Sequence, residues 1–115
     1  MSIQELAVLL NATIAQEGED MTMPVSCGYA CDLLSWVLAH GQKGMAWTTV
    51  QTHVNVVAIA VLMEMACVIL SEGNQLDMAS LAKAREEKLA VLVTAKTSYE
   101  VCGLMMRAGI APPQA

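Results

Sequence analysis

The stretch ACVILSEGNQLDMASLAKAREEKLAVLVT, residues 66–94, contains the pattern that decides the fold. It begins with an apolar run over residues 66–70 and ends with a second one over residues 90–93, which is followed by Thr94. Strands covered by helices on both faces are apolar throughout, because neither face meets water. The charged segment between them, residues 77–88, has the length of a three-turn helix. The stretch therefore predicts a strand, a helix and a strand in succession, as in a parallel sheet.

The same alternation continues on both sides of this stretch. Thr97-Ser98-Tyr99-Glu100 is a capping box that predicts a helix over residues 98–108, ended by Gly109. A second capping box at residues 2–5 predicts a helix at the start of the chain, with an apolar face formed by Ile3, Leu6, Ala7 and Leu10. The other predicted elements are strands over residues 12–15, 25–29 and 45–50, and a helix over residues 55–64.

One further helix is predicted to begin at Asp32, whose carboxylate suits an N-cap, and to end at Gly41. Its expected apolar set is Leu33, Leu34, Val37 and Leu38. Together the elements predict an α/β fold: a three-layer sandwich with a mostly parallel central sheet of about five strands flanked by helices. The length suits a single domain over residues 1–115, in which we expect residues 111–115 to be a disordered tail.

Composition excludes several classes of protein. Six Lys and Arg stand against eleven Asp and Glu, for a formal net charge of −5, so the chain lacks the basic stripe of a nucleic-acid binder. The apolar run over residues 54–70 is shorter than the roughly 20 residues of a membrane span and contains Asn55 and Glu64. Glu5 stands where a secretory signal would be basic. We therefore expect a cytoplasmic protein without nucleic-acid or membrane partners, whose four cysteines are thiols.

The balance of apolar and charged residues predicts self-association. Hydrophobic residues make up 56% of the chain and charged residues 15%, which leaves apolar surface after the core is covered. Trp36 and the methionines are candidates for such a surface. A homodimer is the expected outcome.

Three polar loops follow predicted strands, at residues 48–55, 71–74 and 94–98. The carboxyl ends of parallel strands meet at one edge of the sheet, where ligands bind in open α/β folds. Hydroxyls, small residues and helix N-termini at that edge suit a phosphate or another anion. The same residue types also form ordinary caps and turns, so a structural role is the alternative. The candidate ligand-binding residues are Thr48, Thr49, His53, Asn55, Glu72, Gly73 and Thr97.

No motif points to a cofactor, a metal or a catalytic residue. The glycine-rich nucleotide signatures do not occur, and neither does a nucleophile elbow. Cys27 and Cys31 lack the tight spacing of a zinc pair, while Cys67 and Cys102 fall on buried positions of a strand and a helix. His53, at a strand-to-helix junction, suits either an anion or acid–base contact or a simple helix cap.

Several segments resemble the DRTGG domain in order and spacing. They are residues 30–39 (ACDLLSWVLA), 47–49 (WTT), 53–55 (HVN), 68–73 (VILSEG), 84–94 (AREEKLAVLVT) and 97–100 (TSYE). The resemblance covers residues 3–110. That family is a small α/β module similar in fold to the N-terminal domain of HPr kinase/phosphorylase, and it also occurs attached to CBS-domain regulators and some phosphotransacetylases. The sequence departs from it at the Asp-Arg-Thr-Gly-Gly string, whose nearest positional equivalent is residues 49–55, where His53 and Asn55 stand.

The resemblance implies a regulatory or sensory accessory domain without kinase activity. Our first hypothesis is a non-enzymatic regulatory domain that binds a small anionic ligand, a nucleotide or phosphometabolite, at the carboxyl edge of the sheet. The alternative is a protein-interaction or homodimerisation module with a redox-enzyme partner of the iron-only hydrogenase type, near which stand-alone family members often occur. A third hypothesis is an enzyme in which His53 and Glu72 act as acid and base.

Overall fold

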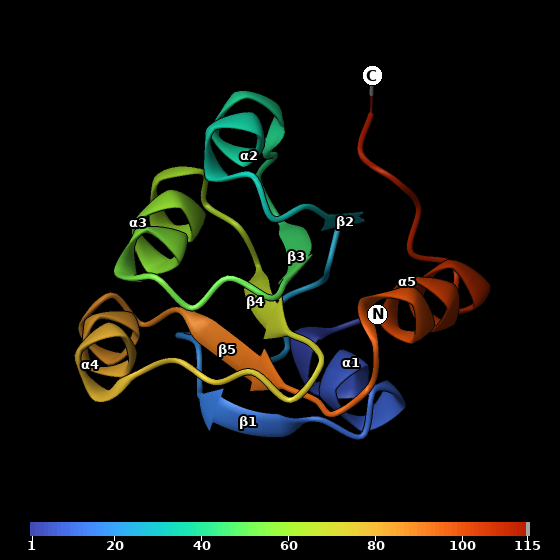
Figure 1. Ribbon diagram of the computed structural model, residues 1–115. Helices are drawn as coiled ribbons and strands as arrows, with labels where there is room; N and C mark the ends of the chain where they lie inside the picture. The colour runs from blue at the N-terminus through green and yellow to red at the C-terminus, as the bar shows by residue number, and fades with distance from the viewer. Residues whose placement is uncertain (115) are drawn as a thin grey trace.

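A five-stranded sheet in the order β1-β5-β4-β3-β2 runs through the computed structural model, which describes residues 1–114 (Figure 1). The strands β2, β3, β4 and β5 are parallel, and β1 joins β5 as an antiparallel edge. The strands are β1 Thr13–Gln16, β2 Cys27–Ala30, β3 Met45–Thr49, β4 Cys67–Leu70 and β5 Ala90–Val93. The helices are α1 Ile3–Leu9, α2 Leu34–His40, α3 Val54–Leu62, α4 Met78–Glu86 and α5 Ser98–Arg107.

Helices cover both faces of this sheet, which confirms the three-layer α/β sandwich. Figure 1 shows α2, α3 and α4 on one side of the strands, and α1 and α5 on the other. Each side has its own core, because neighbouring residues of a strand point to opposite faces. In β3, for example, Ala46 packs with α1 and α5, whereas Trp47 packs with α2 and α3. No helix within residues 1–114 has both the length and the apolar character needed to cross a bilayer.

The strongest sequence patterns give the most accurate elements. Every residue of β4 is buried, and so is every residue of β5 except the partly buried Val93, as the continuous apolar runs predict. Both capping boxes form: Glu5 N–H donates to Ser2 Oγ at 3.1 Å, and Glu100 N–H donates to Thr97 Oγ1 at 3.1 Å. Local hydrogen bonds therefore fix the starts of α1 and α5.

The prediction for α2 is wrong at its start and on its apolar face. Leu33, not Asp32, occupies the N-cap position, and no side chain caps the helix. Val37 is buried, but Leu33 is 62% and Leu38 is 45% exposed. Asp32 is unavailable as a cap because its carboxylate accepts hydrogen bonds from the loop after β3. Within α2, Val37 is the one buried residue.

The segment after α5 runs along the free edge of β2. Gly28 N–H donates to the Ala111 carbonyl at 2.9 Å, and the Gln42 amide donates to the Gln114 carbonyl at 2.6 Å. Gly28 permits this approach, since a Cβ there would lie 3.3 Å from Ile110 Cγ2. Residues 111–114 thus have defined contacts, residue 115 lies outside the described residues, and disorder of the tail stays a prediction.

Candidate ligand-binding edge of the sheet

The carboxyl ends of β2, β3, β4 and β5 lie along one edge of the sheet, because these strands are parallel. Each is followed by a helix that begins at the same edge. Backbone N–H groups and the positive ends of the helix dipoles therefore point there. Six of the seven candidate residues fall into three groups along this edge, and Thr48 stands apart from them.

The first group joins the loops after β2 and β3. Thr49 Oγ1 donates to Asp32 Oδ1 at 2.8 Å, and Val50 N–H donates to the same oxygen at 2.9 Å. Thr49 Oγ1 also accepts from Gln51 N–H at 3.1 Å, and the Gln51 amide donates to the Asp32 carbonyl at 3.2 Å. Thr49 is 1% exposed, so its hydroxyl is a buried structural link between two loops.

The second group closes the start of α5. Ser98 N–H donates to Glu72 Oε2 at 3.0 Å, and the hydroxyls of Ser71 and Ser98 lie 2.6 Å apart. Gly73 N–H donates to the Thr94 carbonyl, in a turn where Glu72 and Gly73 both have positive φ. Two carboxylates, Glu72 and the capping-box Glu100, therefore take the N–H groups that a bound anion would otherwise use.

Electrostatics at this second group agree with its geometry. The backbone N–H and the hydroxyl of Thr97 lower the pKa of Glu100, so its carboxylate is ionised at neutral pH. The hydroxyl and N–H of Thr97 are thus both used by the helix cap. Thr97 can contact a ligand only if the capping box opens.

The third group lies at the starts of α3 and α4. His53 is exposed and caps α3, with its Nδ1 accepting from Asn55 N–H at 3.1 Å. Asp77 caps α4 by accepting from Ser80 N–H at 2.7 Å, which lowers the pKa of Asp77, and His53 lowers it more weakly. The side chain of Asn55 lines a groove between α2 and α3 instead of joining the other groups.

Thr48 differs from the other candidates because its hydroxyl is unpaired. It is 1% exposed, and its Oγ1 has no hydrogen-bond partner among the described residues. In the sheet it stands between Ala30 and Ile69, on the face covered by α1 and α5. A buried hydroxyl that makes no hydrogen bond costs about 1–3 kcal/mol of folding stability.

Sequence reasoning missed the residues that bind these groups together. Asp32, Ser71 and Ser98 make hydrogen bonds across 17 to 27 positions of the chain. No local pattern indicates such partners, although Ser71 directly follows the buried strand β4. Among residues 1–114, no three His, Cys, Asp or Glu side chains gather as a metal-binding group.

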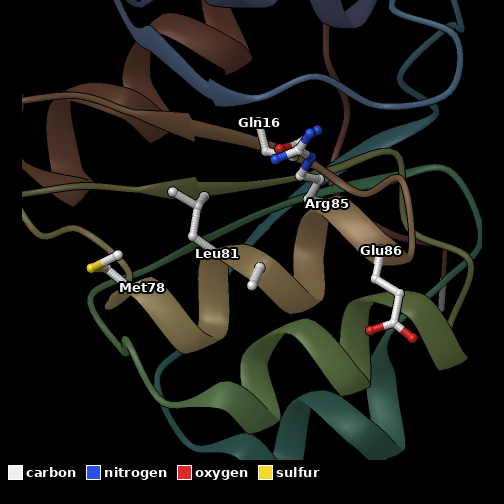
Figure 2. Close-up of a pocket in the computed structure, with 6 residues that line it drawn as sticks. Gln16, Met78, Leu81, Arg85 and Glu86 are labelled. Atoms are coloured by element: carbon white, nitrogen blue, oxygen red, sulfur yellow. The ribbon is translucent and has the colours of Figure 1, made fainter.

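A broad hollow of about 560 Å³ lies elsewhere, on the outer surface of α4 (Figure 2). Figure 2 shows Arg85 reaching toward Gln16 at the end of β1, while Glu86 points away from it. Met78 and Leu81 supply its apolar part. It contains none of the candidate residues, and its charged side chains, Arg85 and Glu86, are exposed to solvent.

Comparison with known proteins shows a DRTGG-like fold. The chain is similar to the crystal structure of the CBS and DRTGG domains of the regulatory region of Clostridium perfringens pyrophosphatase, complexed with its activator, diadenosine tetraphosphate. The TM-score is 0.76 at 14% sequence identity, over 97% of this chain and 47% of that one. The chain thus spans about half the length of that structure. No family model and no curated protein matches the sequence.

Proposed function

We propose that this chain is a non-enzymatic regulatory domain that binds a small anionic ligand, a nucleotide or phosphometabolite, at the carboxyl edge of its sheet. The observation that carries the proposal is the fold. It matches, over 97% of the chain, a regulatory region that is complexed with a nucleotide activator. Parallel α/β sheets bind ligands at this edge because helix N-termini and strand-following loops converge there.

The start of α3, with His53, is the best place for an anion along this edge. The starts of α4 and α5 are already neutralised by the carboxylates of Asp77, Glu72 and Glu100. At α3 the cap is an imidazole instead, which uses Nδ1 for Asn55 N–H. Its Nε2 then carries the ring proton and is the nitrogen that donates to a ligand oxygen. The other candidates along this edge, which we propose as further ligand contacts, are Thr48, Thr49, Asn55, Glu72, Gly73 and Thr97.

A thermal-shift titration tests this function. AMP, ATP, diadenosine tetraphosphate and inorganic phosphate serve as probes, and a ligand at about 100 times its Kd adds about 2.7 kcal/mol of stability. We expect a saturable rise in Tm with at least one probe, lost in His53→Ala and retained in His40→Ala. His40 is the matched control, because it lies on α2, stacked on Trp36. No shift with any probe, or equal affinity in the two variants, would contradict the proposal.

The absence of catalysis is part of the same proposal. His53 and Glu72, the acid–base pair of the enzyme hypothesis, both accept hydrogen bonds from backbone N–H groups at helix starts. These hydrogen bonds give His53 and Glu72 a structural role, so neither residue requires a catalytic one. We also propose a cytoplasmic location, which the four free cysteines support.

A second function, protein interaction, is favoured by one surface. We call it the α2–α3 face and define it by the groove between these helices, where the exposed Leu38 and Leu62 lie beside Leu34, Ala58 and Ile59. Such a face suits a homodimer or docking on a redox enzyme. Light scattering at high micromolar concentration tests it, and a dimer is expected.

A further inference from the structure

A hollow of about 270 Å³ lies between β2, α5 and the segment that follows α5. Its volume is close to the lower end of the range of small-molecule pockets, which is about 300–1,000 Å³. It shares no residue with the candidate site at the carboxyl edge or with the α2–α3 face. The residues that line it are Gly28, Tyr29 and Ala30 of β2, Cys102, Met105 and Met106 of α5, and Ile110, Pro112 and Pro113 after α5.

The lining of this hollow is uncharged. Among the described residues that form it, none is Asp, Glu, Lys, Arg or His. Its polar side-chain groups are the Tyr29 hydroxyl and the Cys102 thiol, and a thiol is a weak hydrogen-bond donor. A charged ligand would lose its hydration here without gaining a partner of opposite charge. The lining therefore favours an uncharged, largely apolar occupant.

The segment after α5 is held beside β2 at two points. The Ala111 carbonyl accepts from Gly28 N–H at 2.9 Å. Further along, the Gln42 amide donates to the Gln114 carbonyl at 2.6 Å and accepts from Gln114 N–H at 3.3 Å. These hydrogen bonds fix the position of the two prolines between them.

Pro112 and Pro113 border the hollow without filling it. Pro112 is exposed and Pro113 is half-buried. On the wall formed by α5, Met106 is 60% exposed. A molecule in the hollow would bury apolar surface of all three side chains, which is favourable in water. The hollow thus lacks an apolar occupant of its own.

Volume and lining together indicate an aromatic molecule. An apolar cavity of about 150 Å³ holds benzene, so the 270 Å³ of this hollow accommodates one or two fused rings. Three of the lining side chains, those of Cys102, Met105 and Met106, contain sulfur. Thioether sulfurs make favourable contacts with aromatic rings, and unbranched methionine side chains adapt to the shape of a ligand.

We propose that this hollow, which we call the β2–α5 hollow, binds an uncharged aromatic molecule of one or two rings. The inference goes beyond the proposed function, because its ligand and its residues differ from those of the anion site beside His53. The segment over residues 111–114 is part of the β2–α5 hollow, so the bound molecule and this segment stabilise each other.

Protection of Cys102 from alkylation tests the proposal, with indole as the probe. Iodoacetamide labels the full chain at increasing indole concentrations, and mass spectrometry of the peptides follows each thiol. At saturation, indole should slow the labelling of Cys102 at least about tenfold, because a covered thiol cannot react. Cys31 is the internal control, since it is also partly exposed but packs on the opposite face of the sheet. Its rate should not change.

A second probe and two variants locate the site. Indole-3-acetate, which adds a carboxylate to the same ring, should not protect Cys102. Met106→Glu places a charge in the wall and should weaken indole binding at least about tenfold. Tyr99→Glu is the matched control, since Tyr99 is 89% exposed on α5 but does not line the hollow. In that variant, indole should protect Cys102 as in the original chain.

Far-UV circular dichroism checks that each variant folds, and Met106→Gln replaces Met106→Glu if the latter does not. Unchanged labelling of Cys102 at every indole concentration overturns the proposal, and so does equal slowing of Cys102 and Cys31. Protection by indole-3-acetate overturns the requirement for an uncharged ligand. Protection that Met106→Glu leaves intact overturns the assigned location.

Discussion

At the scale of single residues, Asp32 shows how one side chain links distant loops. Its carboxylate accepts from the Thr49 hydroxyl and from Val50 N–H, and thereby ties the end of β2 to the end of β3. The Thr49 hydroxyl is buried, so it cannot exchange this partner for water. The loss of a partner for a buried donor costs more than the bond itself contributes.

Asp32→Ala should therefore lower the free energy of unfolding by about 1–3 kcal/mol. Urea denaturation followed by circular dichroism measures this loss. Asp20→Ala is the matched control, because Asp20 accepts the same two kinds of hydrogen bond, from the N–H and hydroxyl of Thr22, in an exposed turn. Water replaces those bonds, so the loss should be smaller. Equal losses in the two variants would show that burial of Thr49 is unimportant.

Cys67 is a second residue whose behaviour follows from burial. It is 0% exposed, and burial raises the pKa of its thiol from 9.0 to about 12. The unfolded chain thus ionises this thiol before the folded chain does, and stability is lost as pH rises from about 9 toward 12. In Cys67→Ala, the free energy of unfolding should fall less steeply over this range. Iodoacetamide at pH 8 should label the partly exposed Cys31 far faster than Cys67, and equal labelling would contradict this account.

At the scale of elements, sequence patterns predict what local forces control. The strands β4 and β5 and the helix α5 lie within about two residues of their predicted positions, because their apolar runs and capping box are local signals. The start of α2 could not be predicted this way. Asp32 is a good cap residue, but Thr49 and Val50, 17 and 18 positions away, compete for its carboxylate.

The candidate site was predictable only in part, for the same reason. The alternation of strands and helices indicates which loops share an edge. It does not indicate that Glu72 turns onto Ser98 N–H or that Asn55 faces the groove beside α2. These arrangements depend on the packing of whole helices against the sheet.

The capping box of α5 gives a prediction at this scale. Thr97→Ala should cost about 1 kcal/mol in urea denaturation, because Glu100 N–H loses its acceptor, whereas Thr97→Ser keeps the hydroxyl and should cost less. The hydrogen bonds from Thr97 also lower the pKa of Glu100. Their contribution is therefore present at neutral pH and is lost as pH falls below about 4.5. If Thr97→Ala and the original chain lose the same free energy of unfolding as pH falls below about 4.5, the capping box is not the cause of this pH dependence.

At the scale of the whole molecule, the distribution of charge divides the surface by role. The charged side chains of α4 form a solvated face, on which Lys83 Nζ and Glu87 Oε1 make a salt bridge at 3.2 Å. The α2–α3 face has none of these charges, and the carboxyl edge is lined by the acidic Asp32, Glu72 and Asp77. The groove of the α2–α3 face and the acidic edge therefore differ in charge, and they meet at Asn55, whose N–H donates to His53 Nδ1.

Dimerisation on the α2–α3 face would couple stability to concentration. A second copy binds the folded chain and not the unfolded one, so mass action raises Tm as protein concentration increases. Each tenfold rise in concentration above the Kd should add up to about 1.4 kcal/mol per dimer, measurable as a steady increase of Tm in differential scanning calorimetry. Leu62→Glu should have a Tm that is independent of concentration. Val8→Glu should show the same rise of Tm with concentration as the original chain, because Val8 is exposed on α1, on the opposite face of the sheet. A Tm that does not change with concentration in the original chain would mean that α2 is stable with its side chains in water.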